Sequence, residues 1–450
     1  MVYCSLFRVA KRSFFQDILS VFGSNVSVTI SNLLTGILLS RILGAAGFGI
    51  YSSILVVPVI VIGFTQLGIR RSTIYHIGNR LIPEEQVISA LFLLLLWTSA
   101  LSIILCGGAF FFYGNGHYDP LIIGLVLLTI PLLLANMFAG GVFFGREEIR
   151  RGNIMNAAPT LLTLVFTAVF VWICPLSVLG AFLAISSANL LSFIYVVYTL
   201  FIRSRNRITW KYQEPVMKSM IKLGLVNAIA IFVLQLNYRM DILMLKQLSS
   251  FEQVGYYSLS TQIAEQLWHI PFAIEMIILS RSANTTDQEL LHRTVASVFR
   301  VSFVLGILSG IALFFIVPWL VPAIFGKSFV PAVEMIRIIL PGILILVGFR
   351  ILNSRLTGMG KPQVAIYTFV PALLINFLLN LFLIPKFGGI GAAWATNVSY
   401  AAGAIAFLFV YARLSRMPVA QLLTFRRSDF YFLRDIRNRF SRKHPPTYGS

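Results

Sequence analysis

The sequence predicts an all-α integral membrane protein of about twelve transmembrane helices, arranged as two six-helix lobes. Three observations lead to this fold class: an apolar composition, apolar stretches of spanning length, and an asymmetric placement of basic residues. The 450-residue chain is 58% hydrophobic and only 12% charged, whereas soluble domains carry about 25% charged residues. A single core cannot bury this much apolar surface, so we expect lipid to surround most of the chain.

Apolar stretches long enough to cross the hydrocarbon recur along the whole chain, since about 20 mostly apolar residues suffice for a helix. They lie at 18–42, 44–68, 86–113, 119–144, 153–174, 176–202, 221–247, 253–280, 297–322, 333–357, 362–386 and 388–414. The first stretch is the least hydrophobic, because it contains Asn25, Ser27, Thr29, Ser31, Asn32 and Thr35. Asn25, Thr29, Asn32 and Gly36 are spaced four, three and four residues apart and therefore lie along one helix face. We expect this face, including Asn25 and Asn32, to line a wet path.

The basic residues indicate how the spans are oriented. Most of the 36 Lys and Arg residues fall in alternate loops and at the two termini, which places both termini in the cytoplasm. The exceptions lie within spans or at their outer ends: Arg41, Arg239, Lys246, Lys327, Arg337, Arg350 and Lys386. The net charge of +20 is therefore explained by the basic residues that keep the loops and termini in the cytoplasm. No nucleic-acid partner is expected.

The predicted organisation has four parts. Residues 1–202 form an N-terminal six-helix lobe, 203–220 a cytoplasmic linker, 221–414 a C-terminal six-helix lobe, and 415–450 a basic cytoplasmic tail. The tail interleaves arginines with aromatic residues, which is typical of a segment lying on anionic lipid. A solvated tail that only sets the topology is the alternative.

The two predicted lobes share short motifs in the same order. Matching pairs are Gly49–Ser52 with Gly255–Ser258, Pro131 with Pro341, Gly145-Arg146 with Gly360-Lys361, Pro159 with Pro371, and Gly180-Ala181 with Gly391-Ala392. Because each lobe has an even number of spans, the lobes run in the same direction and are related by an axis along the membrane normal. Transporters with parallel repeats place the substrate path between such lobes.

Charged groups inside the membrane are costly and therefore mark candidate functional sites. Arg239 and Asp241 are two residues apart, on different faces of one helix, so they cannot simply neutralise each other and at least one needs a partner elsewhere or an aqueous cavity. Gln235 precedes them on the same span. Arg41, Arg239 and Arg350 are the candidates for binding an anionic headgroup, because guanidinium matches phosphate geometry. For Arg41, an interfacial role with the charge reaching water is the alternative.

Glu265 and His269 are four residues apart and are expected to be neighbours on one helix face. Such a pair could pass protons or hold a cation. The alternative is a satisfied polar contact beside Pro271. Together with Asn25, Asn32, Gln235 and Asp241, these two residues are the candidates for lining the cavity or coupling transport to an ion.

Enzyme signatures do not emerge from the sequence. The Gly326-Lys327-Ser328 run lacks the upstream glycine of a phosphate-binding loop, because position 321 is valine. Neither a His/Cys metal-site spacing nor a nucleophile motif is found. We therefore expect a transporter that binds no metal or cofactor, with proton or sodium coupling as the open question. A membrane-embedded polymerase or ligase is disfavoured, because the predicted outer loops are too short to present catalytic groups.

A series of short motifs runs through the chain: Leu39–Gly44, Phe48–Tyr51, Arg239–Asp241, Val254–Tyr257, Phe325–Phe329, Pro341-Gly342, Gly358–Gly360 and Asn380–Ala393. In this order and spacing they resemble the polysaccharide flippases, the Wzx-type members of the multidrug/oligosaccharidyl-lipid/polysaccharide exporter superfamily. The resemblance covers residues from about 15 to 415. Arg239 and Asp241 fall on positions that match the charged seventh span of that family.

The resemblance implies a fold, a substrate and a location. It implies two six-helix lobes around a central cavity in the bacterial cytoplasmic membrane. The implied substrate is an undecaprenyl-pyrophosphate-linked oligosaccharide for O-antigen, capsule or exopolysaccharide synthesis, flipped by alternating access, with other polysaccharide assembly proteins as candidate partners. The rival is a drug or metabolite antiporter of the related multidrug branch, whose cavity should be dominated by acidic residues.

Overall fold

A computed structural model describes residues 2–79, 82–114, 116, 118–203, 214–269, 278 and 288–425. These residues form helices joined by short turns and contain no strand. The first half comprises α1 (Val2–Thr65), α2 (Ile69–Gly78), α3 (Glu84–Gly114), α4 (Pro120–Gly145), α5 (Ile149–Thr167), η1 (Ala168–Ile173), α6 (Ser177–Val197) and η2 (Tyr198–Arg203). The second half comprises α7 (Glu214–Leu248), α8 (Phe251–Ala264), η3 (Glu265–Trp268), α10 (Gln288–Ile324), η4 (Lys327–Phe329), α11 (Ala332–Gly358), α12 (Gln363–Phe387), α13 (Gly389–Ser415) and α14 (Val419–Leu423).

Ten of the described helical stretches are long and apolar enough to cross a membrane. The first, Ser20–Thr65, contains two spans, because Gly44 breaks α1 with a φ of 66° that only glycine adopts readily. The shorter α8 continues directly into η3, and residues 270–277 of the predicted eighth span lie outside the described residues. The predicted all-α membrane fold is confirmed. The second span within Ser20–Thr65, together with α8 and η3, brings the ten stretches to the twelve spans of the two-lobe plan.

Several helices extend beyond the apolar stretches that predicted them. The first begins at Val2, α7 at Glu214 and α10 at Gln288, well before the predicted starts at 18, 221 and 297. Hydropathy detects only the part of a helix that lies in hydrocarbon, so polar helical ends are missed. Most of the predicted linker, residues 204–213, and residues 426–450 of the tail lie outside the described residues.

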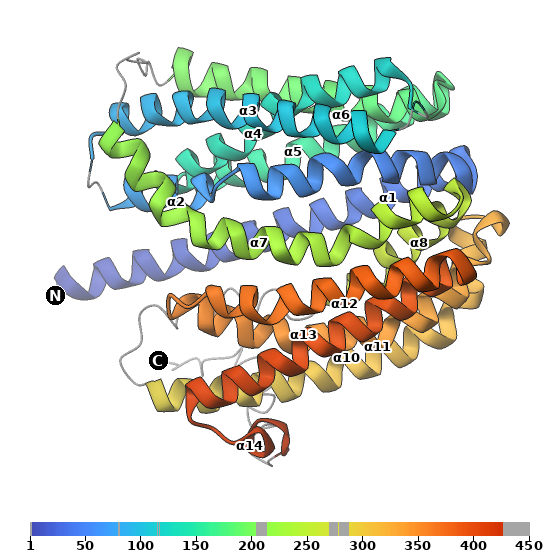
Figure 1. Cartoon of the computed structure of the whole chain (residues 1–450). Coiled ribbons are helices and arrows are strands. Elements are labelled where there is room, and N and C mark those ends of the chain that lie inside the picture. The colour runs from blue at the N-terminus through green and yellow to red at the C-terminus, as the bar shows by residue number, and fades with distance from the viewer. Residues whose placement is uncertain are drawn as a thin grey trace, which may run out of the picture.

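The long helices lie side by side and form one bundle (Figure 1). In this view α7 and α8 lie with α1 between the helices α3–α6 and the helices α10–α13. The start of α1 and the end of α13 lie at the same end of the bundle (Figure 1). We call this end, which also carries α2 and the α11–α12 turn, the basic end, because Arg70, Arg71 and Lys361 are found there.

The outer surface of the bundle is apolar, as lipid contact requires. Large side chains that would be buried in a soluble protein are widely exposed, including Trp97, Phe111 and Trp319. Phe111, for example, is 81% exposed. Helices satisfy their own backbone hydrogen bonds and can therefore present such faces to hydrocarbon. The polar side chains are instead turned inward, where they form the site described next.

Candidate functional site

A cavity of about 650 Å³ lies between the two halves of the bundle. The first half lines it with α1, α2, α4, α5 and α6, and the second half with α7, α8 and η3. Its polar lining consists of Asn32, Thr35, Ser52, Arg70, Asn136, Asn156, Thr160, Thr163, Asn189, Arg239, Ser258, Thr261, Gln262, Glu265 and Gln266. We call this space the central cavity. Its place at the interface of the halves agrees with the path predicted from the repeat.

The second half supplies the ion pair of the central cavity. The Arg239 guanidinium donates from Nη1 to Glu265 Oε1 at 3.0 Å and from Nη2 to Glu265 Oε2 at 2.9 Å. This bidentate geometry orients the guanidinium plane and strengthens the pair. The Arg239 side chain remains 25% exposed, so it can also contact a ligand in the cavity.

The first half supplies a second arginine, Arg70, from the short helix α2. Leu67 and Gly68 have positive φ values of 48° and 63°, which interrupt the helix between α1 and α2, and Arg70 in the first turn of α2 lines the cavity. Its guanidinium lies 5.6 Å from the centroid of the Phe144 ring. Arg70, Arg239 and Glu265 are the only charged residues among the described lining residues. Their formal charges sum to one positive charge, which favours an anionic ligand.

Amide side chains of the first half complete the lining. Asn136 on α4 donates from Nδ2 to the Asn189 backbone oxygen on α6 at 3.1 Å. Asn156 on α5 donates to Asn25 Oδ1 on α1 at 3.1 Å, which places Asn25 directly behind the lining. Asn32 lines the cavity itself and is exposed to it. The polar face predicted for the first span therefore does face the interior of the bundle.

Asp241 lies away from the central cavity, fully buried within the second half. Its Oδ1 accepts from Asn376 Nδ2 at 2.8 Å and from Asn380 Nδ2 at 2.5 Å. Its Oδ2 accepts from the Tyr257 hydroxyl at 2.6 Å and from Thr396 Oγ1 at 2.7 Å. We call these five residues the Asp241 cluster. Arg239 and Asp241 thus do not pair with each other, and each has partners from other helices.

At the end of the bundle opposite the basic end, α1 contacts α8 and α10. A Cβ on Gly49 would lie 1.8 Å from the Phe251 backbone oxygen, and one on Gly255 would lie 2.1 Å from the Ala45 oxygen. Gly49 and Gly255, which occupy matching positions in the internal repeat, thus contact each other. Matching residues of two halves can meet in this way only where they lie close to the axis that relates the halves. Exposed Arg41 donates from Nε to the Ile324 oxygen at 2.6 Å.

A second close contact between the halves lies at the basic end. A Cβ on Gly68 would lie 2.8 Å from Gly224 Cα, and one on Gly224 would lie 2.0 Å from the Leu67 oxygen. Beside it, His76 Nε2 and Ser219 Oγ are 3.0 Å apart. Backbones of the two halves therefore touch on both sides of the central cavity.

The structure separates the three arginines predicted to bind a headgroup. Arg239 lines the central cavity, Arg41 lies at the opposite end, and Arg350 lines a smaller cavity together with Gln235. Glu265 lines the central cavity but pairs with Arg239 rather than with His269, which is exposed at the end of η3. The predicted Glu265–His269 pair is corrected accordingly, because a nearer cationic partner comes from α7.

Sequence reasoning missed Arg70, Asn136 and Asn189 in the central cavity. Arg70 follows directly on an apolar span, where the sequence predicts a cytoplasmic loop, because hydropathy does not detect the short polar helix α2. The two asparagines are isolated polar residues within apolar spans. Burying such an amide is costly unless it is hydrogen-bonded, and this cost is the signal that could have identified them.

The long apolar helices and the polar cavity between the halves define a multi-pass membrane transporter rather than an enzyme. Residues 38–334 match the family described as polysaccharide biosynthesis protein. The chain belongs to that family. It is also 22% identical over 426 residues to a Shigella flexneri protein provisionally named an O-antigen transporter, a match that covers 89% of this chain and 97% of that protein. An uncharacterised membrane protein of Methanocaldococcus jannaschii is 24% identical over 246 residues, 51% of this chain and 57% of that protein.

Solved transporters share the fold. An inward closed structure of the lipid II flippase MurJ superposes with a TM-score of 0.72 at 12% identity, covering 96% of this chain and 94% of that one. An inward-facing multidrug resistance MATE transporter superposes with a TM-score of 0.67 at 14% identity, covering 88% and 95%. At these identities the likeness establishes the fold alone.

Proposed function

We propose that the protein moves a polyprenyl-diphosphate-linked oligosaccharide from the cytoplasmic to the outer leaflet of the bacterial inner membrane. The observation that carries this proposal is the central cavity, where Arg70 and Arg239 face a lining of amides and hydroxyls. Guanidinium groups suit a diphosphate, and amide and hydroxyl side chains can donate to and accept from sugar hydroxyls. The family to which the chain belongs supports the same assignment. With the basic end in the cytoplasm, both termini would lie there as well.

Alternating access is the mechanism that this geometry supports best. The halves touch through Gly49 and Gly255 at one end and through Gly68 and Gly224 at the other. Opening one contact while keeping the other would expose the central cavity to one side of the membrane at a time. Rocking of two repeats around a site between them is a general transporter mechanism.

The Asp241 cluster is the proposed site of coupling to a proton or sodium ion. A fully buried carboxylate is costly without a positive partner, and the side-chain groups that donate to Asp241 are neutral amides and hydroxyls. A proton would neutralise the charge directly. A sodium ion would instead need oxygen ligands, which the carboxylate, Tyr257 and Thr396 can offer, and which the two asparagines can offer once their amide groups are turned over.

Replacement of Asp241 with asparagine is expected to abolish the response of transport to an imposed ion gradient. The amide is nearly isosteric but neutral, so it cannot take up a proton and lacks the negative charge that would hold a sodium ion. In proteoliposomes the gradient-driven rate should fall to the rate without a gradient, whichever of the two ions is used. Thr396→Ser retains the hydroxyl and serves as the matched control. An unchanged gradient response in Asp241→Asn would refute the coupling role.

The function itself is tested by deleting the gene in a host without a redundant flippase. Loss of surface polysaccharide, with the undecaprenyl-linked repeat unit accumulating in the cytoplasmic leaflet, is the expected result. Re-expression of the wild-type chain should restore the polysaccharide. Normal surface polysaccharide after deletion would instead favour an ion-coupled multidrug or metabolite antiporter, whose MATE relatives share the fold. Such an antiporter should have a cavity dominated by acidic residues, whereas Glu265 is the single acidic residue among the described residues that line the central cavity.

A further inference from the structure

A separate cavity of about 470 Å³ lies between α5 and α6 in the first half of the bundle. Ile194 of its lining is exposed, so the cavity opens toward the lipid that surrounds the bundle. None of the described residues that line it is charged, and Ser192 donates its hydroxyl to the Ala188 backbone oxygen at 2.9 Å. The other polar groups of the lining are the hydroxyls of Tyr195 and Tyr198. We call this apolar space the α5–α6 groove.

Helix α5 separates the α5–α6 groove from the central cavity. Asn156 and Pro159 line the central cavity, whereas Ala158 and Leu162 line the groove. Spacings of three and four residues place each pair on its own face of the helix. Met155 belongs to the lining of both spaces. The polar cavity and the apolar groove are therefore continuous except for this one side chain.

Pro159 weakens the wall at the same place. Proline has no N–H, so the helical hydrogen bond to the Met155 carbonyl cannot form. Helices bend most readily where such a bond is missing. A bend of α5 here would move Met155 away from the boundary and join the two spaces.

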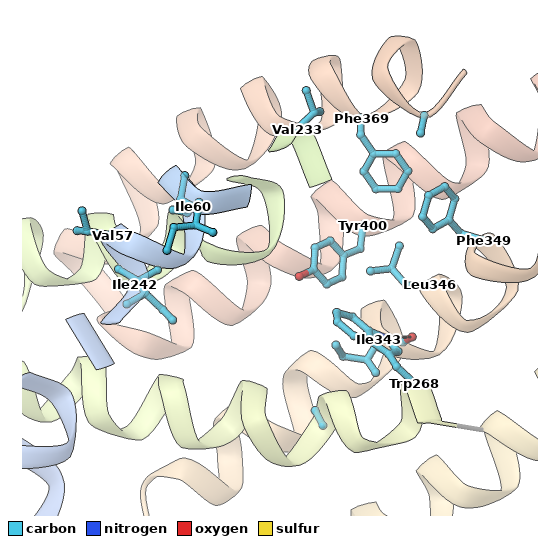
Figure 2. Close-up of a cluster of buried hydrophobic side chains, with 14 of the residues drawn as sticks. Val57, Ile60, Val233, Ile242, Trp268, Ile343, Leu346, Phe349, Phe369 and Tyr400 are labelled. Carbon is cyan, nitrogen blue, oxygen red and sulfur yellow. Dashed lines mark hydrogen bonds between the residues drawn. The ribbon is translucent and has the colours of Figure 1, made fainter. Parts of the chain in front are cut away.

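The matching helix pair of the second half, α12 and α13, is filled at this place. Counted from the matched prolines, Ala157 corresponds to Phe369, and counted from the matched Gly-Ala pairs, Ser192 corresponds to Gly403. The Phe369 ring lies 4.5 Å from the Phe349 ring, between centroids, within a buried cluster (Figure 2), and a Cβ on Gly403 would lie 2.9 Å from it. The alanine and serine of the first half are too small to fill the equivalent space. An opening kept in one repeat and filled in the other favours a ligand site.

We infer that the α5–α6 groove binds the isoprenoid chain of the substrate while the diphosphate occupies the central cavity. This inference rests on the proposed function, in which one molecule carries a polar headgroup and a long hydrocarbon chain. With the headgroup between the halves, the chain must leave the central cavity through a wall of the bundle. The groove offers an apolar space directly behind such a wall, on the lipid side of Met155.

The position of the groove suits loading from the cytoplasmic leaflet. A Cβ on Gly145, shortly before α5 begins, would lie 2.9 Å from Ile77 Cβ of α2, so α5 starts at the basic end. The groove uses the first turns of α5 and the last turns of α6, which lie near that end. Tyr195 and Tyr198 are the kind of residue found at the headgroup level of a bilayer.

Packing rather than the hydrophobic effect must hold the chain, because the surrounding lipid tails are as apolar as the chain itself. An isoprenoid carries a methyl branch and a double bond in each repeating unit. It is therefore bulkier and stiffer than an acyl chain, and it loses less conformational entropy when it is ordered in a groove of fixed shape. These properties favour an isoprenoid over a phospholipid tail as the occupant.

Photo-crosslinking from two adjacent leucines of α6 tests this site. Leu191 lines the groove and Leu190 does not, although their exposed fractions are 45% and 49%. The crosslinking amino acid p-benzoylphenylalanine is placed at either position of the full chain, in phosphatidylethanolamine and phosphatidylglycerol nanodiscs that contain radiolabelled undecaprenyl diphosphate. We expect at least about fivefold more labelled product from position 191. Excess unlabelled undecaprenyl diphosphate should compete for labelling, whereas excess dioleoyl phosphatidic acid should not.

A substitution that fills the groove gives an independent test. Ala158→Phe places a ring in the groove and should lower the labelled product from position 191 by roughly tenfold, because on the order of ten carbon contacts with the chain are lost. Translocation should slow as well. Val165→Phe adds the same ring at an exposed position of α5 outside the groove and should change neither quantity. Monodisperse elution of each variant shows that it is folded.

The outcomes separate the groove from the proposed function. Equal labelling from positions 190 and 191, or equal competition by phosphatidic acid, would assign the groove to bulk phospholipid and overturn the inference. Undiminished labelling in Ala158→Phe would do the same, and loss of surface polysaccharide on gene deletion would still uphold the proposed function. Selective labelling from position 191, together with normal surface polysaccharide after deletion, would uphold the isoprenoid site and refute the proposed function.

Discussion

Replacement of Arg239 with alanine is expected to lower the rate of translocation by about a hundredfold. The guanidinium is one of two cationic groups in the central cavity, and it holds Glu265 through two hydrogen bonds. Its loss removes a phosphate ligand and leaves the Glu265 carboxylate unpaired, which repels an anionic headgroup. Truncating one member of such a charge pair costs about 2–5 kcal/mol. The measurement is the initial rate at which lipid-linked repeat units reach the outer leaflet, at equal expression.

The partner of Arg239 provides the matched control. Glu265→Gln removes the competing carboxylate while keeping the shape of the side chain, so the concentration of substrate that gives half-maximal rate should fall rather than rise. The double variant Arg239→Gln/Glu265→Gln should transport better than Arg239→Ala, because no unpaired carboxylate remains. Full activity in Arg239→Ala would exclude the headgroup role for this residue.

Replacement of Gly255 with alanine is expected to destabilise closure at the end opposite the basic end. The new Cβ would lie 2.1 Å from the Ala45 oxygen, so α8 must move away from α1 or the contact must open. Overpacking of this kind costs about 1–3 kcal/mol, which shifts the balance between the two states by roughly fivefold to a hundredfold. Transport should fall because one of its two states is depopulated.

Labelling from the two sides of the membrane measures this shift. In a chain with Cys4, Cys106 and Cys174 replaced by serine, Ser52→Cys places a thiol in the central cavity. With Gly255→Ala, an impermeant thiol reagent should react about tenfold faster from outside. Gly224→Ala is the matched control at the basic end, where its Cβ would lie 2.0 Å from the Leu67 oxygen, and it should raise labelling in inside-out vesicles instead. Equal labelling of both variants from both sides would contradict the assignment of these contacts as gates.

Features that depend on the pattern along one segment could be predicted from the sequence. The spans were predicted from the lengths of the apolar stretches, and the break near residue 44 from the gap between two such stretches. The relation between the halves was predicted from the repeated motifs. The matched glycines Gly49 and Gly255 proved to be in contact. The two-residue spacing predicted that Arg239 and Asp241 do not neutralise each other, because this depends only on the geometry of one helix.

Features that depend on which helices meet could not be predicted in the same way. Glu265 pairs with an arginine from α7 rather than with a residue four positions along its own chain. Arg70 lines the central cavity from α2, which begins after the positive φ values of Leu67 and Gly68, and no hydropathy pattern indicates this break. Arg350 of α11 lies against the Trp268 ring of η3, which in turn contacts Tyr238 of α7. Such contacts are properties of packing between helices.

The size of the central cavity limits how much of a lipid-linked glycan can contact the protein at one time. A volume of about 650 Å³ lies within the range of pockets that enclose a drug-sized ligand, about 300–1,000 Å³. A polyprenyl chain bearing several sugars is much larger, so the proposed substrate would fit only with its diphosphate and the nearest sugar inside. Recognition would then be confined to the reducing end of the glycan. Hosts could diversify the distal sugars of their surface antigens without changing this transporter.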